Sequence, residues 1–361
     1  MIPIVKPYIP PREVLMPELE KVIYSGYIAQ GEQVEKFELK LGEYFDTNKV
    51  LTVNSGTSAL HLALILANVS PGDEVISSAL TAEPTNTVIA QTGAKVVWAD
   101  TESDTGLICP KSVEKLITNK TKVIMIVHYA GMVVNLDKFY EIREKYHIPI
   151  IEDCAHAFGA EYKGKKLGYY SDFAIYSFQA IKHLTTIDGG LLVLKSSADY
   201  TRAKKLRWFG LDKSTPRLQN DIKEVGYKYH MNDVNATFGL VQLDFLQENV
   251  NKYIENGLFF DNALTNINGI KVIKYHDNTK PSYWLYTAIV ERRDDFIEYM
   301  KSNGVICSPL HLRNDRHSIF EDGSHLNGLE SFYTKFIHWG CGWWIDENER
   351  TKIVDLIKKG W

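Results

Sequence analysis

The sequence lacks any apolar run that approaches the roughly 20 residues needed to span a membrane. Its first residues, MIPIVKPYIPP, lack the basic-then-apolar order of a signal peptide. Long runs of one charge are missing too, and 41 Lys and Arg against 45 Asp and Glu residues give a net charge of -4. These absences argue against membrane and nucleic-acid partners. We expect a cytoplasmic protein whose partners are small molecules or further copies of itself.

Cysteine is scarce and scattered along the chain. The four cysteines form no CxxC pair, and no His-rich zinc spacing accompanies them. We therefore expect reduced thiols and no metal site. Hydrophobic residues make up 45% of the sequence and charged residues 24%, a composition that supports a folded core and not a disordered chain.

Apolar runs of strand length alternate with helical patterns through the first two thirds of the 361 residues. This alternation predicts an α/β domain around a mostly parallel sheet. From about Asn251 the pattern changes and predicts a smaller α+β domain. We expect a large domain over residues 1–250 and a small one over 251–361, packed closely because no Gly/Ser linker separates them. The runs assigned to strands are VLTV, DEVISSA, KVVWAD, KVIMIVH, IPIIED, FAIYSF and GLLVL.

The stretch NSGTSALHLALILANVS, residues 54–70, places Gly56, Thr57 and Ser58 between a strand-like run and a helical apolar run. The first turn of a helix has free backbone N–H groups and the positive end of the helix dipole, which suits a phosphate. Serine and threonine are also the preferred helix caps. Taken alone, this stretch is therefore more often an ordinary cap than a phosphate site.

The stretch IPIIEDCAHAFGAEYKGKKLG, residues 148–168, delivers Glu152 and Asp153 at the C-terminal end of an apolar strand. Proteins of the α/β class place their ligands at this edge of a parallel sheet. A carboxylate there is also a common helix cap or rim charge. His156, three residues further on, is equally compatible with a packed or a surface histidine.

The stretch YSFQAIKHLTTIDGG, residues 176–190, holds Lys182 at a tight exit from an aromatic strand. A lysine desolvated between apolar neighbours has a lowered pKa and serves as a nucleophilic amine, although most lysines are solvated charges. The three stretches taken together favour the reactive amine over the solvated charge. Pyridoxal phosphate requires an anion site for its phosphate, a carboxylate for its ring nitrogen and an amine for the Schiff base. The sequence supplies these groups in order: the phosphate cup, Asp153 at a strand end, and Lys182, which follows 29 residues later (182 − 153) and close to Ser177.

Eight sequence blocks between about Tyr24 and Gln242 occur in the order of one known family. The blocks are SGTSALHLAL, GDEVISSALT, GAKVVWAD, VHYAGMVVNL, IEDCAHAFGAEYKGKKLG, SFQAIKHLTT, DGGLL and GYKYHMNDVNATFGLVQL. Together they resemble the DegT/DnrJ/StrS-type sugar-nucleotide aminotransferases, which are fold type I pyridoxal phosphate enzymes. The resemblance implies a large domain with a mostly parallel, seven-stranded sheet flanked by helices, a smaller C-terminal α+β domain, and a homodimer with shared active sites.

The resemblance implies a role for each polar group around the cofactor. Lys182 is expected to form the Schiff base and shuttle the proton, and Asp153 to keep the pyridine nitrogen protonated. His156 stands where relatives often carry glutamine near the ring hydroxyl. The residues expected around the phosphate are Gly56, Thr57, Ser58, Ser177 and, from the neighbouring subunit, His230.

Substrate contacts are expected, on the same resemblance, from several separate segments. SGYIAQG, residues 25–31, is similar to a segment that approaches the sugar nucleotide, with a mobile surface loop as the open alternative. The C-terminal SPLHLRNDRHSIF offers polar groups, with a surface turn as its alternative. The residues expected near the substrate are Tyr27, Gly31, Ala82, Glu83, His183, His311 and Arg313.

Two positions depart from the family pattern. Many relatives stack an aromatic ring on the cofactor where TAEPTN has Ala82 or its neighbour Glu83. Relatives usually carry a glycine where Ile187 precedes Asp188. A position with φ > 0 disfavours a β-branched residue, so we expect a different backbone at Ile187.

The implied reaction is reversible amino transfer. Glutamate, the common donor in this family, converts the aldehyde cofactor to its amine form, pyridoxamine phosphate, which then aminates a keto group on a nucleotide-linked hexose. A 4-keto-6-deoxy sugar is the expected acceptor, and its product is an NDP-4-amino-4,6-dideoxyhexose. A 3-keto sugar and a nucleotide-linked octulosonate are the alternatives.

Two rival functions are weaker. Sister enzymes that remove a sugar hydroxyl carry histidine in place of the lysine, but counting five residues from Ser177 gives Lys182 and leaves His183 as an extra neighbour. A ligand-sensing regulator that uses the same fold is the other rival, because fold does not determine function. The intact Lys182 and Asp153, together with the absence of an appended helix-turn-helix pattern, favour an enzyme.

Overall fold

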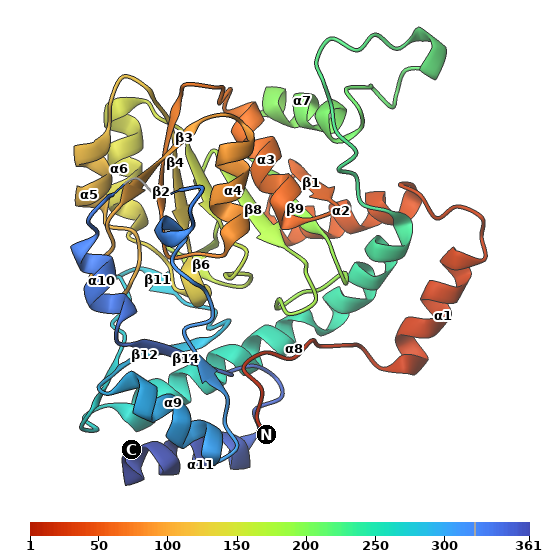
Figure 1. The fold of residues 1–361 in the computed structure, drawn as a ribbon. Helices are drawn as coiled ribbons and strands as arrows, with labels where there is room; N and C mark the ends of the chain where they lie inside the picture. Colours follow the sequence, from red (N-terminus) through yellow and green to blue (C-terminus); the bar gives the residue numbers. More distant parts are fainter. Residues whose placement is uncertain (321–322) are drawn as a thin grey trace.

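The computed structural model describes residues 1–320 and 323–361. Its main body is a seven-stranded sheet flanked by helices, and a second, smaller sheet lies below it with both chain termini nearby (Figure 1). All four cysteines are free. No helix in the described part of the chain is both long enough and apolar enough to cross a bilayer.

The large sheet has the strand order β1-β9-β8-β5-β4-β2-β3. β9 runs antiparallel to both of its neighbours, and every other neighbouring pair is parallel. The predicted mostly parallel sheet is therefore confirmed, and each run assigned to a strand forms one. The strands are β1 (Val50–Val53), β2 (Glu74–Ser78), β3 (Lys95–Ala99), β4 (Thr121–Val127), β5 (Ile150–Asp153), β8 (Phe173–Ser177) and β9 (Gly190–Leu194).

Most connections between the parallel strands carry helices, because a parallel strand must be reached by a crossover to the other end of the sheet. The connection from β5 to β8 contains short strands and no helix. α3 is almost wholly buried, since it packs against β8 and β9. α5 and α6 pack against each other. The helices of this layer are α3 (Gly56–Leu66), α4 (Glu83–Gln91), α5 (Pro110–Leu116), α6 (Leu136–Tyr146) and α7 (Ser197–Arg207).

A second antiparallel sheet with the order β10-β12-β14-β13 forms the C-terminal part. Figure 1 shows α9 and α11 beneath it. Its elements are β10 (Ile270–Val272), β12 (Tyr286–Val290), α9 (Arg293–Ser302), β13 (Cys307–Ser308), α10 (Asn327–Tyr333), β14 (Phe336–Trp339) and α11 (Glu347–Lys359). The short elements are β6 (Glu161–Tyr162), β7 (Lys165–Lys166), β11 (Thr279–Lys280), η1 (Tyr129–Gly131), η2 (Arg217–Gln219) and η3 (Asn314–Arg316).

The 32-residue helix α8 (Asp233–Leu264) joins the two parts. Its first half packs against α1 (Arg12–Ile23) and α2 (Glu32–Phe45), and its last residues belong to the core of the C-terminal sheet. The expected boundary between residues 250 and 251 falls inside this helix. Ile2 also packs in the second core, with its N–H donating to Gly304 O at 2.7 Å. The division into domains 1–250 and 251–361 therefore stays a prediction.

The segment between α7 and α8 extends away from the body at the upper right of Figure 1. We call residues 209–226 the arm. It exposes four large apolar side chains, Phe209, Leu218, Ile222 and Val225, with relative exposures of 38%, 101%, 56% and 76%. Exposed apolar side chains gathered on one projecting segment are typical of a surface that contacts another molecule.

Ile187 lies in the connection between β8 and β9, with φ 71 and 55% of its surface exposed. The expectation of a different backbone is therefore wrong, because the chain takes a left-handed conformation here despite the β-branched side chain. Hydrogen bonds maintain it. Ile187 N–H donates to Thr185 Oγ1 at 2.9 Å, and Asn235 Nδ2 donates to the carbonyls of Thr186 and Asp188, both at 2.7 Å.

Ile187→Asn should stabilise the protein by about 1 kcal/mol, because asparagine tolerates the left-handed region at which isoleucine is strained. The midpoint of thermal unfolding should rise by about 1–2 °C. Ile9→Asn is the matched control, since Ile9 is 56% exposed and has no positive φ. An unchanged or lower midpoint for Ile187→Asn alone would show that the left-handed backbone there carries no strain.

Candidate active site

A cavity of about 350 Å³ opens at the carboxyl edge of the large sheet, beside the N-terminus of α3. This is the edge at which parallel α/β sheets bind ligands. Most of the predicted cofactor residues and two predicted substrate residues meet here. Those that line the cavity are Gly56, Thr57, Ala82, Glu83, Asp153, His156, Ser177 and Lys182.

The N-terminus of α3 forms one end of the cavity. Ser55 caps the helix by accepting a hydrogen bond from Ser58 N–H, at 3.1 Å from its Oγ. The N–H groups of Gly56 and Thr57 stand in the first helical turn, where no carbonyl one turn earlier is available to them. A Cβ on Gly56 would lie only 3.0 Å from Ser177 Cβ. This close approach brings a serine hydroxyl to a helix N-terminus, an arrangement that suits phosphate.

Ser58 does not belong to this cup, contrary to the expectation from its sequence position. Its hydroxyl donates to Asn54 Oδ1 at 2.6 Å and lies 2.9 Å from Ser55 Oγ. Its N–H is taken by the same Ser55 hydroxyl, and Ser58 is not part of the cavity lining. The structure makes it a helix-capping residue.

Asp153 ends β5 and is only 3% exposed. Its Oδ2 accepts a hydrogen bond from the Thr85 hydroxyl at 2.8 Å, and its Oδ1 accepts one from Ala155 N–H at 3.0 Å. Burial raises the pKa of Asp153, and these two bonds oppose that rise. A buried carboxylate in this state favours a cationic partner, such as a protonated pyridine nitrogen. The sequence patterns did not mark Thr85, because a threonine in a helix has many ordinary roles.

Lys182 lies in the tight connection that follows β8. Its N–H donates to Gln179 O at 3.0 Å, and the turn is closed by Thr186 N–H donating to Phe178 O at 2.9 Å. Burial lowers the pKa of Lys182 to about 7, with the charge of Asp153 acting in the opposite direction. At neutral pH a substantial fraction of this amine is therefore unprotonated and nucleophilic.

His156 lies between the cavity and the C-terminal part of the chain. Its Nδ1 accepts a hydrogen bond from Ala130 N–H at 3.4 Å, which places the ring proton on Nε2. Burial lowers the pKa of His156 well below the ordinary range, so the ring is neutral and Nε2–H is a hydrogen-bond donor. Its ring stacks on Trp284 with the centroids 3.9 Å apart, a contact that no sequence pattern indicated.

The walls of the cavity have small side chains where many relatives place an aromatic ring. Both candidates for that position, Ala82 and Glu83, line the cavity, and so does Ala155. Ala82 is the N-cap of α4, and Glu83 is the first residue of that helix. A flat ring would meet methyl groups here, while the Glu83 carboxylate adds a negative charge at the same opening.

His311 stands next to the cavity, with its ring nearly parallel to that of His156 and 5.9 Å from it. Burial lowers the pKa of His311 to about 4, although nearby Glu83 opposes this shift. Its buried Nε2 has no hydrogen-bond partner among the described residues. A neutral imidazole with a free ring nitrogen beside the cavity is compatible with the predicted substrate contact.

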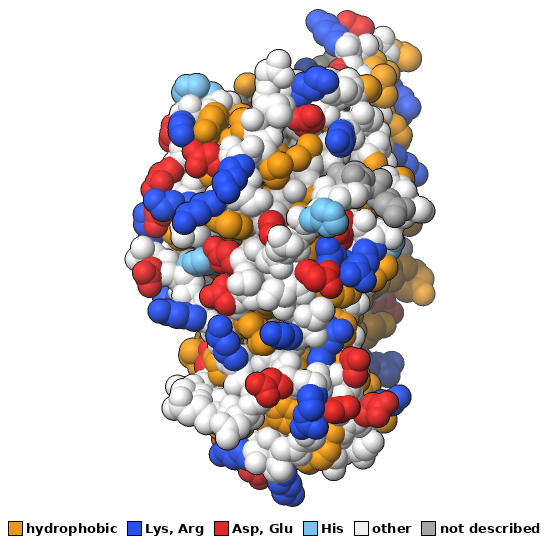
Figure 2. All heavy atoms as spheres, turned by 60° about the vertical axis from the view of Figure 1, so that its left-hand side comes forward, with side chains coloured by type: hydrophobic (Ala, Val, Ile, Leu, Met, Phe, Trp, Pro, Cys, Tyr) orange, Lys and Arg blue, Asp and Glu red, His pale blue; other side chains and the backbone are white. Residues whose placement is uncertain are grey.

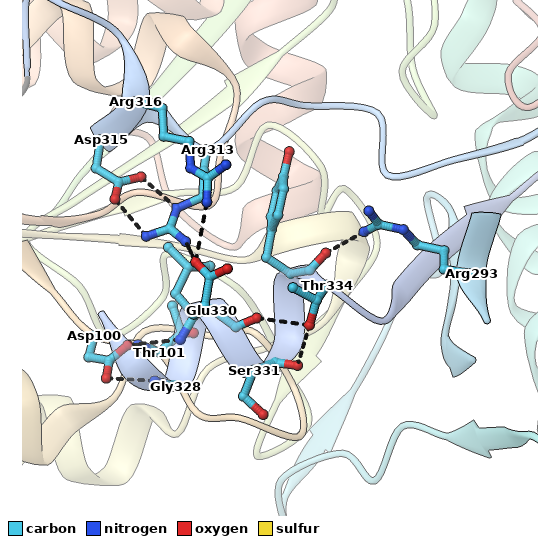
Figure 3. A network of polar contacts seen from close by, with 12 residues as sticks. Asp100, Thr101, Arg293, Arg313, Asp315, Arg316, Gly328, Glu330, Ser331 and Thr334 are labelled. Atoms are coloured by element: carbon cyan, nitrogen blue, oxygen red, sulfur yellow. Dashed lines mark hydrogen bonds and ion pairs between the residues drawn. The ribbon is translucent and has the colours of Figure 1, made fainter. Parts of the chain in front are cut away.

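Arg313 was expected to contact the substrate, but its guanidinium group is already bonded to carboxylates of the chain. It donates two hydrogen bonds to Asp315, at 2.8 and 2.7 Å, and it pairs with Glu330, which also pairs with Arg316 (Figure 3). Arg313 is 4% exposed. Its guanidinium group therefore connects η3 to α10 and has little capacity left for a substrate.

The expected substrate contact of His183 is also wrong. Its side chain is turned away from the cavity and buried, with Nε2 at 3.1 Å from Ser282 O and the ring against Tyr253. Burial lowers the pKa of His183 to about 4. The residue secures the lysine turn to the C-terminal part of the chain and does not reach the substrate region.

The remaining predicted residues lie outside this cavity. Tyr27 and Gly31 line a second cavity, and Gly31 N–H donates to Asp233 Oδ1 at 2.7 Å, so that glycine serves to cap α2. His230 packs against Trp208 with ring centroids 4.0 Å apart, and its Nδ1 has no partner among the described residues. The expected contacts of Tyr27 and Gly31 with the substrate, and of His230 with the phosphate site of a second copy of the chain, stay predictions.

One buried group in the described residues, His128, Glu152 and Cys154, has the side-chain types of a metal site. Hydrogen bonds already account for its arrangement. His128 Nδ1 accepts from Val134 N–H at 3.4 Å, its Nε2 faces Glu152 at 3.3 Å, and the Tyr140 hydroxyl donates to Glu152 at 2.6 Å. These bonds form a network around Glu152 and His128, next to Asp153 in the chain.

A mostly parallel seven-stranded sheet that carries a buried aspartate, a partly buried lysine and a helix N-terminus at one edge is the arrangement of a pyridoxal phosphate enzyme of fold type I. The chain belongs to the DegT/DnrJ/EryC1/StrS aminotransferase family, whose model matches residues 12–358. The fold-class, family and enzyme predictions are thereby confirmed.

Named relatives agree with this assignment. The chain is 34% identical over 276 residues, 74% of its length and 70% of the relative's, to UDP-4-amino-4-deoxy-L-arabinose–oxoglutarate aminotransferase of Shewanella sediminis. It superposes on the sugar aminotransferase CalS13 from Micromonospora echinospora with a TM-score of 0.96 and 31% identity, covering 100% of both chains. It also superposes on the PLP form of Spr1654 from Streptococcus pneumoniae with a TM-score of 0.90 and 28% identity, covering 99% and 98% of the two chains.

Ser177→Ala should weaken pyridoxal phosphate binding roughly tenfold or more, because a hydrogen bond to a charged group is lost. Ser58→Ala should leave cofactor affinity near that of the unmodified protein but lower the midpoint of thermal unfolding, since its bonds to Asn54 and Ser55 disappear. Fluorescence titration of the cofactor-free chain and thermal unfolding measure the two effects. Equal loss of affinity in both variants would return Ser58 to the phosphate site.

Proposed function

We propose that this aminotransferase moves an amino group from glutamate to a nucleotide-linked keto sugar, using pyridoxal 5'-phosphate. The acceptor we favour is an NDP-4-keto-6-deoxyhexose, which yields an NDP-4-amino-4,6-dideoxyhexose. The observation that carries the proposal is the buried Lys182 amine, with a pKa of about 7, in one cavity with Asp153 and the α3 N-terminus. The Shewanella relative's name, with its 4-amino sugar nucleotide and its oxoglutarate, supports amination at C4 of a nucleotide-linked sugar and glutamate as the donor.

The cavity residues fit the cofactor on grounds independent of the relatives. The cup of Gly56, Thr57 and Ser177 suits its phosphate, and the Asp153 carboxylate suits its ring nitrogen. Pyridoxal phosphate bound here would supply an electron sink, its protonated ring, for the negative charge that develops on the amine carbon of the substrate. The small walls at Ala82 and Ala155 leave room for a flat ring.

The chain's own residues handle the protons. Lys182 Nζ, whose pKa burial lowers to about 7, would take a proton from the substrate carbon and return it to the adjoining carbon of the cofactor. Asp153 holds its negative charge against burial through Thr85 and Ala155. His156 offers Nε2–H to an oxygen at the ring edge, since Ala130 fixes the tautomer through Nδ1.

The orientation of two neighbouring residues disfavours the dehydration reaction of sister enzymes. Those enzymes have a histidine where the lysine stands. Here Lys182 lines the cavity, whereas His183 is bonded to Ser282 O and points away from it. The arrangement therefore supports amino transfer.

We also propose that the enzyme is a cytoplasmic homodimer with shared active sites. The arm exposes Leu218, Ile222 and Val225, which a second copy would cover. His230, close to the base of the arm, has a buried Nδ1 without a partner among the described residues, as expected for a side chain completed by another subunit. The free cysteines agree with a reducing compartment.

The acceptor is tested by incubating the purified enzyme with glutamate and a panel of nucleotide-linked 3-keto and 4-keto sugars. The 4-keto-6-deoxyhexose should gain an amine, detected by mass spectrometry. Lys182→Ala should form no product, and borohydride should no longer attach the cofactor to the chain. Amination of a 3-keto sugar alone would move the reaction to C3, and cofactor trapping on a residue other than Lys182 would overturn the assignment of the lysine.

The shared site is tested by mixing two inactive variants, Lys182→Ala and His230→Ala. In a mixed dimer with shared sites, one site carries both substitutions and the other carries neither. Random reassortment should then restore about a quarter of the original activity. No restoration, with mixed dimers demonstrated by native mass spectrometry, would place Lys182 and His230 of each site in the same chain.

A further inference from the structure

Trp284 makes three contacts with the catalytic machinery. It lies between β11 and β12 and is 1% exposed. Lys182 Nζ stands 3.7 Å from the centroid of its ring, and the His156 ring stacks on it at 3.9 Å with an interplanar angle of 20°. Its Nε1–H donates to Ile181 O at 2.9 Å. One indole therefore touches the catalytic amine, the backbone next to that amine and the neutral imidazole.

The backbone around Trp284 is held in place by the turn η1. Ser282 N–H donates to Gly131 O at 3.0 Å, and Leu285 N–H donates to Ala130 O at 3.3 Å. A Cβ on Gly131 would lie 2.7 Å from Trp284 N, so only glycine permits this approach. The indole is thus a rigid part of the site, because its backbone is bonded on both sides.

The contact between the indole and Lys182 affects the charge of the amine. Burial removes the hydration that an ammonium group needs and lowers the pKa of Lys182. The face of an indole is the aromatic surface that attracts a cation best. Other ionisable groups surround the amine. The Asp153 carboxylate at the end of β5 favours its charged form, and the charged amine in turn lowers the pKa values of His156, His183 and His311. Glu83 from α4 lines the same cavity.

We propose that Trp284 is the positioning residue of the catalytic lysine, with its indole face holding the free Lys182 amine in place and favouring the ammonium form. The proposal rests on the proposed function in one respect, namely that Lys182 is the lysine that reacts with the cofactor. A lysine that moves protons must be neutral at one moment and charged at another. The indole face adds its attraction for the protonated amine to that of the Asp153 carboxylate.

The decisive experiment changes the charge distribution of the indole face and leaves its shape almost unchanged. Tryptophan analogues with one, two or three fluorines are introduced at position 284 of the full-length, cofactor-free chain. Competitive acetylation across a pH series, followed by peptide mass spectrometry, gives the titration midpoint of Lys182. The midpoint should fall with each added fluorine, by about half a pH unit or more across the series, since fluorine weakens the attraction of the ring for a cation.

Trp98 is the matched control, because it is also buried and its Nε1–H also donates to a backbone carbonyl, that of Phe320, at 3.4 Å. Fluorination at position 98 should leave the Lys182 midpoint unchanged. Trp284→Phe, which keeps a weaker aromatic face, should lower the midpoint in a chain whose thermal unfolding shows that it is folded. A constant midpoint across the position-284 series, or an equal fall at position 98, overturns the proposal.

The measurement separates this proposal from the proposed function. It reads the amine of Lys182 directly and involves neither sugar nor glutamate. If the enzyme aminates a different acceptor, the fluorine series is unaffected. If borohydride trapping shows that the cofactor attaches elsewhere, the proposed function fails, while the series still reports whether Trp284 controls the charge on Lys182.

Discussion

The structure depends on keeping two opposite charges, on Asp153 and Lys182, away from water at one edge of a sheet. Burial raises the pKa of the carboxyl and lowers that of the amine, so each group is pushed towards its neutral form. Hydrogen bonds from Thr85 and Ala155 retain the carboxylate. The Lys182 amine has no such bond from the described residues, and its pKa is about 7, so that it can both give and take a proton near neutral pH. Lys182 can therefore move protons because its interactions only partly offset the effect of burial on its pKa.

The scaffold meets this constraint through close backbone approaches. A Cβ on Gly190, at the start of β9, would lie 2.6 Å from Gly56 N, and one on Gly56 would lie 3.0 Å from Ser177 Cβ. The antiparallel β9 thus presses the N-terminus of α3 against the end of β8, the strand that leads into the lysine turn. The distance between the phosphate cup and Lys182 is fixed by sheet pairing and not by flexible side chains.

The sequence predicts the elements more completely than the contacts. Strand runs, the sheet class and the meeting of Lys182, Asp153 and Gly56 follow from local patterns, because parallel strands present their ends at one edge. Side-chain direction does not follow. Arg313 has the residue type of a substrate contact, but its guanidinium group is bonded to Asp315 and paired with Glu330. Trp284 lies 102 residues from Lys182 in sequence (284 − 182), and only tertiary packing reveals their contact.

That packing makes the C-terminal part of the chain a component of the active site. β12 begins two residues after Trp284 and pairs with β14, where His338 lies 3.3 Å from the Tyr129 hydroxyl. Tyr129 opens the turn η1, whose Ala130 N–H fixes the tautomer of His156. A shift of the second sheet would therefore disturb the histidine through η1 and the lysine through Trp284 together. Gly56, Asp153 and Lys182 come from the first two thirds of the chain, whereas the indole that Lys182 Nζ approaches to 3.7 Å comes from the C-terminal part.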